Sequence, residues 1–445
     1  MGVNPSLLLG HGVAVRADLP LPFSLVLIGS ALALLLSFVA LGSLWTEPRL
    51  RGREAGRPLP RSLTGLLEAP ELAWGLRILG LLGAGYVAVA LFFGPDVDEN
   101  PSAGALYVLL WVGVVGFASA LLGPVWRALN PLRTLHLLAC RAVGRDPRAG
   151  LLRYPERLGR WPAAMTLTSF AWLELAAPNR ATVPVLQAFL VGYALVALGG
   201  AVVFGSTWFS HADGFEVAST LFGHLSVVGR RGDGVLVLRS PLDGVAGIRG
   251  EAGLAAVVSV LLGGTFYDGV SGTLTWIRFA QGSALPRVLV DSVGLLVTIG
   301  AVGAAWTAAT VASGRLARYA SPRALPGTFA HSVVPIALGY LVAHYWSLLV
   351  VGGQLTLHRL SDPLVNGADL LGTGGDSISY AWVQPSLVAG LQVVSIVAGH
   401  VVGVVLAHDQ SVALFKRRRA VVGQLPVVGV MVAFTVTGLV LLFSG

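Results

Sequence analysis

The chain has 445 residues, of which 55% are hydrophobic and only 12% are charged, and its mean hydropathy is +0.76. An ordinary soluble domain carries roughly a quarter charged residues, so this composition excludes a soluble globular protein and predicts an integral membrane protein. The formal net charge of +8 does not indicate nucleic-acid binding, because the basic residues lie in short loops between apolar runs. Cys140 is the only cysteine, which excludes an intrachain disulfide and a Cys-ligated cluster.

Ten apolar runs follow one another along the chain, and most approach the roughly 20 residues that a helix needs to cross the hydrocarbon core. They predict an all-α fold: a polytopic bundle of about ten transmembrane helices with short loops, in which residues 1–445 form a single integral membrane domain. The sixth run is the weakest, because it is short and ends in a glycine-rich segment. The predicted spans are 22–45, 71–94, 104–123, 161–177, 182–208, 251–266, 288–313, 332–352, 381–408 and 421–443.

The basic residues are distributed unevenly between the loops. When the loops are taken alternately, one set carries 24 arginines and lysines and the other set carries 5. Loops rich in arginine and lysine stay on the cytoplasmic side of a membrane. The pattern therefore predicts a multi-pass protein of the plasma (inner) membrane with both termini outside the cell.

Three loops are long enough to hold structure of their own. Residues 124–160 and 210–250 are predicted to be cytoplasmic loops with interfacial helices, because 132–143 reads as an amphipathic basic helix and 215–228 as a second helical stretch. Residues 235–238 form a short apolar stretch that fits a small hairpin. Residues 355–380 are rich in turn signals and form a predicted extracytoplasmic loop.

Four segments resemble a family of prokaryotic integral membrane proteins without an assigned activity. They are 153–162 (RYPERLGRWP), 339–345 (GYLVAHY), 361–363 (SDP) and 399–408, which begins with Gly399-His400 and ends with Ala407-His408. The resemblance extends over most of the chain. It implies a bacterial or archaeal membrane protein and carries no mechanism.

Two carboxylates fall inside predicted spans, where a charge costs about 2.5–3.5 kcal/mol and often marks a functional site. Glu174 and Asp291 each lie about four residues from the outer end of a span. At this matched depth they could bind a cation or relay a proton from an outer vestibule. Alternatively, Asp291 pairs with Arg287 one turn earlier and Glu174 reaches the interface or a neighbouring helix.

Two histidines lie deeper. His344 in the eighth span and His400 in the ninth are at depths that allow neighbouring antiparallel helices to bring the imidazoles together, and Tyr340 stands one turn from His344. Such a pair could bind a haem or a metal ion, or transfer a proton. Alternatively, each imidazole is satisfied by a carbonyl or hydroxyl across a helix interface.

The ninth span also carries Gln392 and a small-residue patch, Gly399 and Gly403, which allows close helix approach. Three prolines within the last three spans each permit a kink. Broken helices often build transporter sites, and two breaks are predicted, at 266–269 and at Asn130-Pro131. The three prolines are Pro335, Pro385 and Pro426.

A group of polar residues in the loop 210–250 could bind a divalent metal, although its histidines are not spaced as in a known zinc motif. A solvated polar helix is the alternative that the spacing favours. The residues are His211, Asp213, Glu216 and His224.

These features favour a multi-pass transporter of a small solute or ion, which we expect to be proton-coupled. No nucleotide-binding motif is present, since 372–375 lacks the Lys-Ser/Thr ending of a P-loop. The first alternative is a membrane redox or metal-binding subunit, with haem or copper on His344 and His400. The second is a lipid-modifying enzyme with an acidic outer site at Asp362, Asp369 and Asp376. The expected partners are the lipid bilayer, a small solute or ion, and partner subunits or further copies of the chain.

Overall fold

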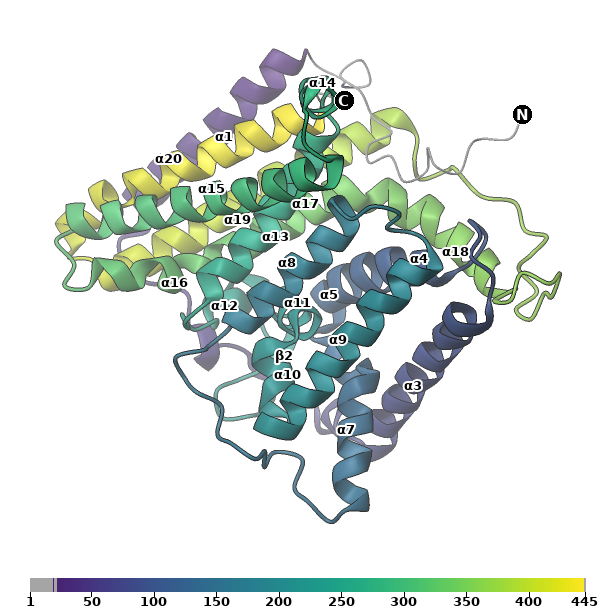
Figure 1. The fold of residues 1–445 in the computed structure, drawn as a ribbon. Helices are drawn as coiled ribbons and strands as arrows, with labels where there is room; N and C mark the ends of the chain where they lie inside the picture. Colours follow the sequence, from purple (N-terminus) through teal and green to yellow (C-terminus); the bar gives the residue numbers. More distant parts are fainter. Residues whose placement is uncertain (1–18, 20–21, 444–445) are drawn as a thin grey trace. The chain divides into compact units, whose positions relative to one another are not determined.

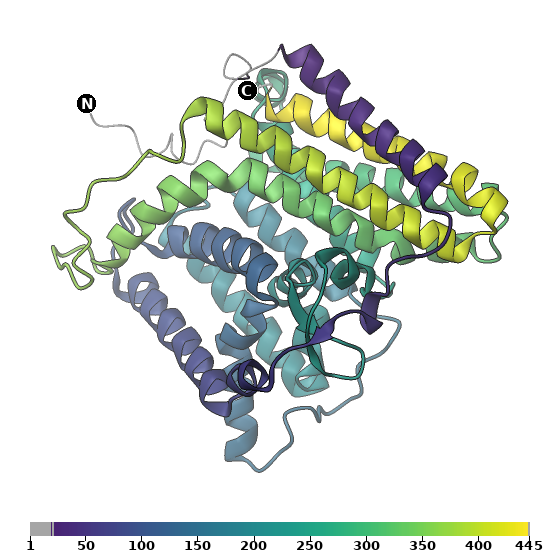
Figure 2. The same ribbon diagram turned by 180° about the vertical axis from the view of Figure 1, so that it is seen from behind.

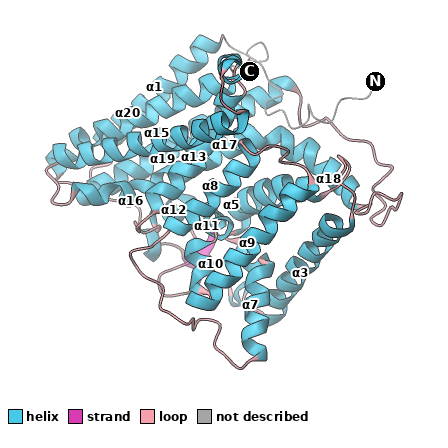
Figure 3. Cartoon of the chain, viewed as in Figure 1, coloured by secondary structure: helices cyan, strands magenta, loops and turns pink. Residues whose placement is uncertain are grey.

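The computed structural model describes residue 19 and residues 22–443. Both chain termini, which are predicted to lie outside the cell, fall beyond these residues. The structure is 72% helical, and Figures 1 and 3 show helices throughout with only short strands. A helical bundle is therefore confirmed.

Nine helical segments in the described part of the chain are long and apolar enough to cross a membrane. This supports a multi-pass membrane protein. The remaining predicted span, 161–177, corresponds to α8 (Trp161–Leu175), whose 15 residues make it shorter than the others. The nine segments are Phe23–Leu44, Arg61–Phe93, Ser102–Leu122, Val183–Phe204, Leu254–Ser271, Arg287–Leu316, Pro322–Leu360, Pro385–Leu414 and Arg419–Leu442.

The chain divides into two compact units. Unit 1 contains Arg57–Leu238 and Leu348–Ala381, and unit 2 contains the described residues up to Gly56, then Arg239–Ser347 and the chain from Trp382 onward.

Unit 1 is built mainly of helices around an aromatic core, in which the ring of Phe170 packs 5.0 Å from the rings of both Trp111 and Phe215. Its elements are β1 (Arg57–Pro58), α2 (Arg61–Leu67), α3 (Pro70–Phe93), α4 (Ser102–Gly104), η4 (Ala105–Ala118), α5 (Ser119–Leu122), α6 (Val125–Leu129), α7 (Pro131–Ala142), α8, α9 (Val183–Phe204), α10 (Thr207–Ala212), α11 (Gly214–Gly223), β2 (Val228–Arg230), β3 (Leu236–Leu238), η7 (Leu348–Gly352) and α18 (Gly353–Leu360).

The predicted loop elements of unit 1 are largely present. The basic amphipathic helix is α7, and the second helical stretch is α11, which ends five residues earlier than expected. The hairpin forms from β2 and β3, and β1 adds a third antiparallel strand from a distant part of the chain. Two segments, η4 and η7, are wound as π-helices, a form that is rare and frequent at functional sites.

Unit 2 is a bundle of long helices, in which α1, α19 and α20 lie side by side in both views of the ribbon (Figures 1 and 2). Its elements are α1 (Phe23–Leu44), η3 (Gly52–Glu54), α12 (Pro241–Ala246), α13 (Leu254–Ser271), α14 (Leu274–Gly282), α15 (Arg287–Leu316), η5 (Pro322–Ala324), α16 (Leu325–Phe329), η6 (Ala330–Val333), α17 (Val334–Ser347), α19 (Pro385–Leu414) and α20 (Arg417–Leu442).

Glycines bring α17 and the preceding turn η6 into backbone contact with α19. A Cβ on Gly399 would lie 2.6 Å from the carbonyl oxygen of Pro335, and one on Gly403 would lie 2.7 Å from that of Ser332. From the other side, a Cβ on Gly339 would lie 2.4 Å from the carbonyl oxygen of Ser395. The predicted close approach at Gly399 and Gly403 is thus confirmed, because no larger residue fits at these positions.

The predicted helix break at 266–269 is wrong. The helix α13 continues through this segment and ends at Ser271. Its glycines serve packing: a Cβ on Gly263 would lie 2.7 Å from Ile299 Cα, and one on Gly269 would lie 2.9 Å from Leu441 Cβ. The break at Asn130-Pro131 is confirmed, since α6 ends at Leu129 and α7 begins at Pro131.

The three prolines differ in position. Pro426 lies inside α20, as predicted. Pro385 is instead the first residue of α19, where a proline costs no helical hydrogen bond, and Pro335 is the second residue of α17. Pro335 and Pro426 therefore lie within continuous helical segments, Pro335 where the 3-10 turn η6 passes into α17, whereas Pro385 only begins a helix.

Candidate functional site

An acidic residue and a histidine pair in the interior of unit 2. The carboxylate oxygen Oδ2 of Asp268 on α13 lies 2.6 Å from Nε2 of His344 on α17. Asp268 is 6% exposed and His344 is 8% exposed. Burial of such groups in an apolar helix bundle is costly unless they are paired and hydrogen-bonded. The predicted site residue His344 is thus joined to a carboxylate from the segment 266–269, for which the sequence predicts a helix break.

Tyr340 lies one turn before His344 on α17, and its hydroxyl donates to the carbonyl oxygen of Phe434 on α20 at 2.7 Å. The Tyr340 ring fills the space beside Gly438 that a side chain at that position would need. A Cβ on Gly438 would lie only 1.4 Å from the Tyr340 hydroxyl oxygen. Tyr340 and His344 also border a cavity of about 10 Å³, together with Thr265 from α13. This is about the space that one water molecule needs.

His400 on α19 is fully buried. Its Nδ1 lies 2.9 Å from the carbonyl oxygen of Ile396, whereas its Nε2 has no hydrogen-bond partner among the described residues. Its ring lies 5.8 Å from that of Tyr340 in an edge-to-face arrangement. Two turns earlier on α19, the Oε1 atom of buried Gln392 also lacks a described partner. Unsatisfied buried polar atoms of this kind call for a water or a ligand.

Asp291 near the start of α15 accepts three hydrogen bonds. The Tyr267 hydroxyl and the Trp276 indole donate to Oδ1 at 2.9 and 3.0 Å, and the Arg287 guanidinium donates to Oδ2 at 2.6 Å. The pairing with Arg287 is therefore present, as the structural alternative predicted. Tyr267 is the neighbour of Asp268 in α13, so consecutive residues reach the two acidic clusters.

Glu174 belongs to unit 1, near the end of α8, and is buried. Its backbone carbonyl accepts from the Arg180 guanidinium at 2.6 Å, and the Arg180 carbonyl accepts from the Tyr107 hydroxyl at 2.8 Å. Asp291 belongs to unit 2. The two carboxylates of the predicted cation path thus have separate local environments.

The described residues, 22–443, contain no donor set of three or more His, Cys, Asp or Glu side chains that would support a metal ion. His344 Nε2 is engaged by Asp268, while His400 Nε2 is open. A bis-histidine site on His344 and His400 stays a prediction.

A second polar cluster lies in unit 1, where two helices begin side by side. Asn130 caps α7 by accepting from the backbone N–H groups of Leu132 and Arg133, and Asp213 caps α11 by accepting from those of Phe215 and Glu216. These two caps bond to each other. The Asn130 amide donates to Asp213 Oδ2 at 2.8 Å.

The same pair of helices carries an ion pair. The Arg133 guanidinium donates to both carboxylate oxygens of Glu216 at 3.0 Å. Burial, followed by the nearby charge of Glu216, raises the pKa of Asp213 to about 7. Burial also raises the pKa of Glu216, although Arg133 opposes this shift. The cluster therefore holds less negative charge near neutral pH than its two carboxylates imply.

The favoured interpretation of this segment as a solvated helix is wrong, because Asp213 is 2% exposed and Glu216 is 1% exposed. The metal interpretation is not supported either. His211 Nδ1 and His224 Nδ1 lie near carbonyl oxygens of their own helices, at 3.1 and 2.7 Å. Sequence reasoning missed the burial because it could not foresee that Asn130 meets Asp213.

The acidic loop of the lipid-enzyme hypothesis is organised by turns. Asp362 accepts from the backbone N–H groups of Asn366 and Gly367, and Asp369 accepts from the Ser361 hydroxyl and the Gly374 N–H. Carboxylates used in this way stabilise a loop. They do not form an evident catalytic group.

Searches against protein-family models, curated proteins and solved structures found no match to this chain.

Proposed function

We propose that this protein is a multi-pass membrane transporter of a small solute or ion, coupled to protons through Asp268 and His344. The observation that carries the proposal is the buried 2.6 Å contact between the Asp268 carboxylate and His344 Nε2. An ionisable pair inside apolar helices is expensive and is a typical element of proton relays in membrane transporters. Histidine suits this role because its ordinary pKa lies closest to physiological pH.

The surroundings of the pair favour a solute or proton path. Tyr340 and His344 border a cavity of about 10 Å³, and the open nitrogen of His400 lies on the neighbouring helix α19 beside the Tyr340 ring. Gln392, two turns from His400, offers a further unsatisfied acceptor. These atoms could exchange hydrogen bonds with water or a small polar solute.

The proposed setting is the plasma (inner) membrane of a prokaryote, crossed ten times with α8 as the fourth span and with both termini outside. The imbalance of basic residues between alternate loops supports this orientation. Tags fused to either end would then be accessible to an impermeant reagent in intact spheroplasts. Protection of either tag contradicts the orientation.

Proton coupling can be tested in proteoliposomes that enclose a pH-sensitive dye. Panels of sugars, amino acids, organic acids and metal ions are added under an imposed membrane potential. We expect at least one class of solute to cause a pH change inside, and we expect Asp268→Asn and His344→Gln to abolish it. Asp233→Asn is the matched control, because Asp233 lies on the exposed hairpin of unit 1.

A wild-type protein that moves no protons with any solute, or variants that fold and move protons normally, would contradict the proposal. Size-exclusion chromatography in detergent checks folding. An absorption spectrum of the same sample tests the redox alternative, since a bound haem would show a Soret band.

A further inference from the structure

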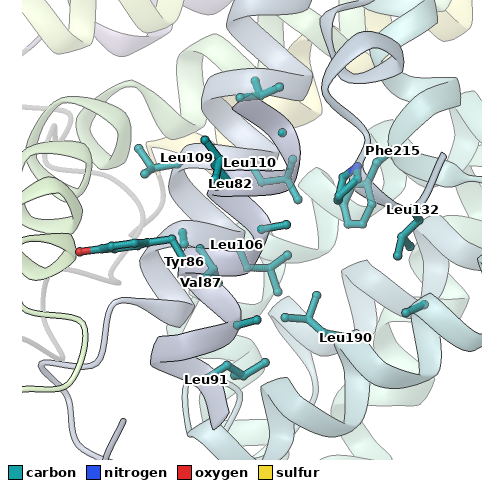
Figure 4. Close-up of a pocket in the computed structure, with 18 of the residues that line it drawn as sticks. Leu82, Tyr86, Val87, Leu91, Leu106, Leu109, Leu110, Leu132, Leu190 and Phe215 are labelled. Carbon is teal, nitrogen blue, oxygen red and sulfur yellow. The ribbon is translucent and has the colours of Figure 1, made fainter. Parts of the chain in front are cut away.

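Unit 1 contains a large apolar pocket that the proposed transport path does not use. Its volume is about 790 Å³, within the range of small-molecule sites. Helices α3 and α9, the π-helix η4 and the start of α7 form its walls. Figure 4 shows Leu82, Leu106 and Leu190 around a common space, while the Tyr86 hydroxyl points away from it. That hydroxyl is used elsewhere, because it donates to the Leu360 carbonyl.

The pocket has the dimensions of a lipid chain. Its lining on α3 extends from Leu79 to Phe92. At about 1.5 Å per residue, this stretch of α3 is about 20 Å long. One leaflet contributes half of a hydrocarbon core that is about 30 Å thick, so the pocket is longer than a single leaflet is deep. Leu82, which lines the pocket, is 67% exposed, and Phe92 is 53% exposed. The pocket is therefore open along a helix whose outer face is apolar.

One end of the pocket is polar and basic. Trp126 and Tyr193 both line it, and the Trp126 Nε1 and Tyr193 hydroxyl atoms are buried without a hydrogen bond of ordinary geometry to any described residue. Trp126 as a whole is 9% exposed. Tyr193 lies close to the side chains of both Trp126 and Asp213. These buried polar atoms make this end of the pocket more polar than its apolar walls.

Arginines gather at the same end. Arg127 follows Trp126 on α6 and Arg133 follows the lining residue Leu132 on α7, and both exert charge on Glu216. The guanidinium groups of Arg77 and Arg141 both lie over the Trp74 ring, 5.0 and 5.1 Å from its centroid. The four arginines outnumber the two buried carboxylates of the neighbouring cluster, Asp213 and Glu216, so the end of the pocket complements a negative head group.

We propose that this pocket binds the hydrocarbon chain of an anionic phospholipid, with the head group at the arginine-rich end formed by the first turns of α3, by α6 and by α7. The apolar walls hold the chain. The arginines select the negatively charged head. This site is separate from the proposed proton path and does not depend on it.

The chain offers a matched pair of positions for testing this. Gly83 and Gly85 both lie on α3 and are exposed, and a Cβ at either would meet nothing within 4 Å. Gly83 lines the pocket and Gly85 does not. A large side chain at Gly83 therefore fills the pocket without a backbone clash, while the same change at Gly85 leaves the pocket open.

The probe is phosphatidylglycerol with a photoreactive group in one acyl chain, incorporated into vesicles with the full-length protein, and the readout is labelling of α3, η4 and α9 by mass spectrometry. We expect Gly83→Phe to lower labelling at least fivefold and Gly83→Leu to lower it less, with Gly85→Phe equal to wild type. We expect a phosphatidylcholine analogue to label at least threefold less, and exposed Arg127→Gln to reduce this difference.

Equal labelling of folded Gly83→Phe and Gly85→Phe overturns the site. Equal labelling by the two lipids overturns the selection of an anionic head group. Gly83→Leu and Arg127→Gln keep the test decisive if Gly83→Phe does not fold, which size-exclusion chromatography reports.

Discussion

Asn130 and Asp213 each cap a helix and also bond to each other, with the Asn130 amide 2.8 Å from Asp213 Oδ2. The bond joins the first turn of α7 to the first turn of α11, although 83 positions separate the two residues. Asn130 therefore caps α7 while it is hydrogen-bonded to the cap of α11, and Asp213 caps α11 while it is hydrogen-bonded to the cap of α7. The arrangement explains why an acidic residue is tolerated here with only 2% exposure.

Replacement of Asn130 by alanine should destabilise unit 1. The change removes the cap of α7, worth about 0.5–2 kcal/mol, and takes the Asn130 amide away from Asp213 Oδ2, which adds about 1–3 kcal/mol. We expect a loss of about 2–4 kcal/mol in the free energy of unfolding, measured by denaturant titration in detergent. Asn366→Ala is the control, because Asn366 only supports an exposed turn. A loss of equal size in the control would show that the shared bond contributes nothing.

Asp213 should make stability depend on pH. Its folded pKa is raised to about 7 from 3.8, so between these values the folded protein binds more protons than the unfolded one. Stability should therefore fall as pH rises from about 4 to about 7 and become level above it. The raised pKa of Glu216 acts in the same direction.

Asp213→Asn imitates the protonated acid, and it should flatten the profile between pH 5 and pH 8 when unfolding is followed at each pH. Asp233→Asn should retain the wild-type slope, because the pKa of Asp233 is lowered by its hydrogen bond with Arg231. An unchanged slope in Asp213→Asn would assign the pH dependence to another group.

The sequence predicts the apolar spans but not the burial of Asp213, and the difference lies in whether a feature depends on neighbouring or on distant residues. Membrane-spanning helices are encoded by neighbouring residues, and nine of the predicted spans correspond to long apolar helices in the described chain. The spacing of Gly399 and Gly403 along one helix is also a local property of the sequence, so it correctly predicted close packing of that helix. Asp268 and His344 are 76 positions apart, and their contact depends on which helices pack together.

The glycines also led to the wrong prediction of a helix break at 266–269. Gly263 and Gly269 suggested a broken helix, yet α13 continues past them and uses them to approach α15 and α20. A glycine in a membrane helix permits either outcome, and the neighbouring helix decides which. For Asp213, the sequence could not reveal the covering helix α7, so burial replaced the expected solvation.

The pair of Asp268 and His344 should show strong energetic coupling. Asp268→Asn and His344→Gln should each cost about 1–3 kcal/mol, because each change leaves a buried partner poorly satisfied. The double variant should cost less than the sum of the two by at least about 1 kcal/mol. Additive losses within about 0.5 kcal/mol would mean that the contact is energetically silent, and would weaken its proposed role as a proton site.

Gly438 should tolerate no side chain, because an added Cβ would lie 1.4 Å from the Tyr340 hydroxyl oxygen and 2.1 Å from the ring carbon that bears it. Gly438→Ala must push the ring out of its place, at a cost of about 1–3 kcal/mol for an overpacked core. The same substitution at Gly429, also on α20, meets nothing within 4 Å and should be neutral or stabilising by up to about 1 kcal/mol.

Tyr340→Leu removes the clashing atoms, so the double variant with Gly438→Ala should recover part of the loss relative to Tyr340→Leu alone. Thermal unfolding of the four variants in one detergent measures these differences. If Gly438→Ala is as stable as Gly429→Ala, then Tyr340 does not occupy the groove on α20. Its hydrogen bond to Phe434, and with it the wall of the cavity beside His344, would then need to be reassigned.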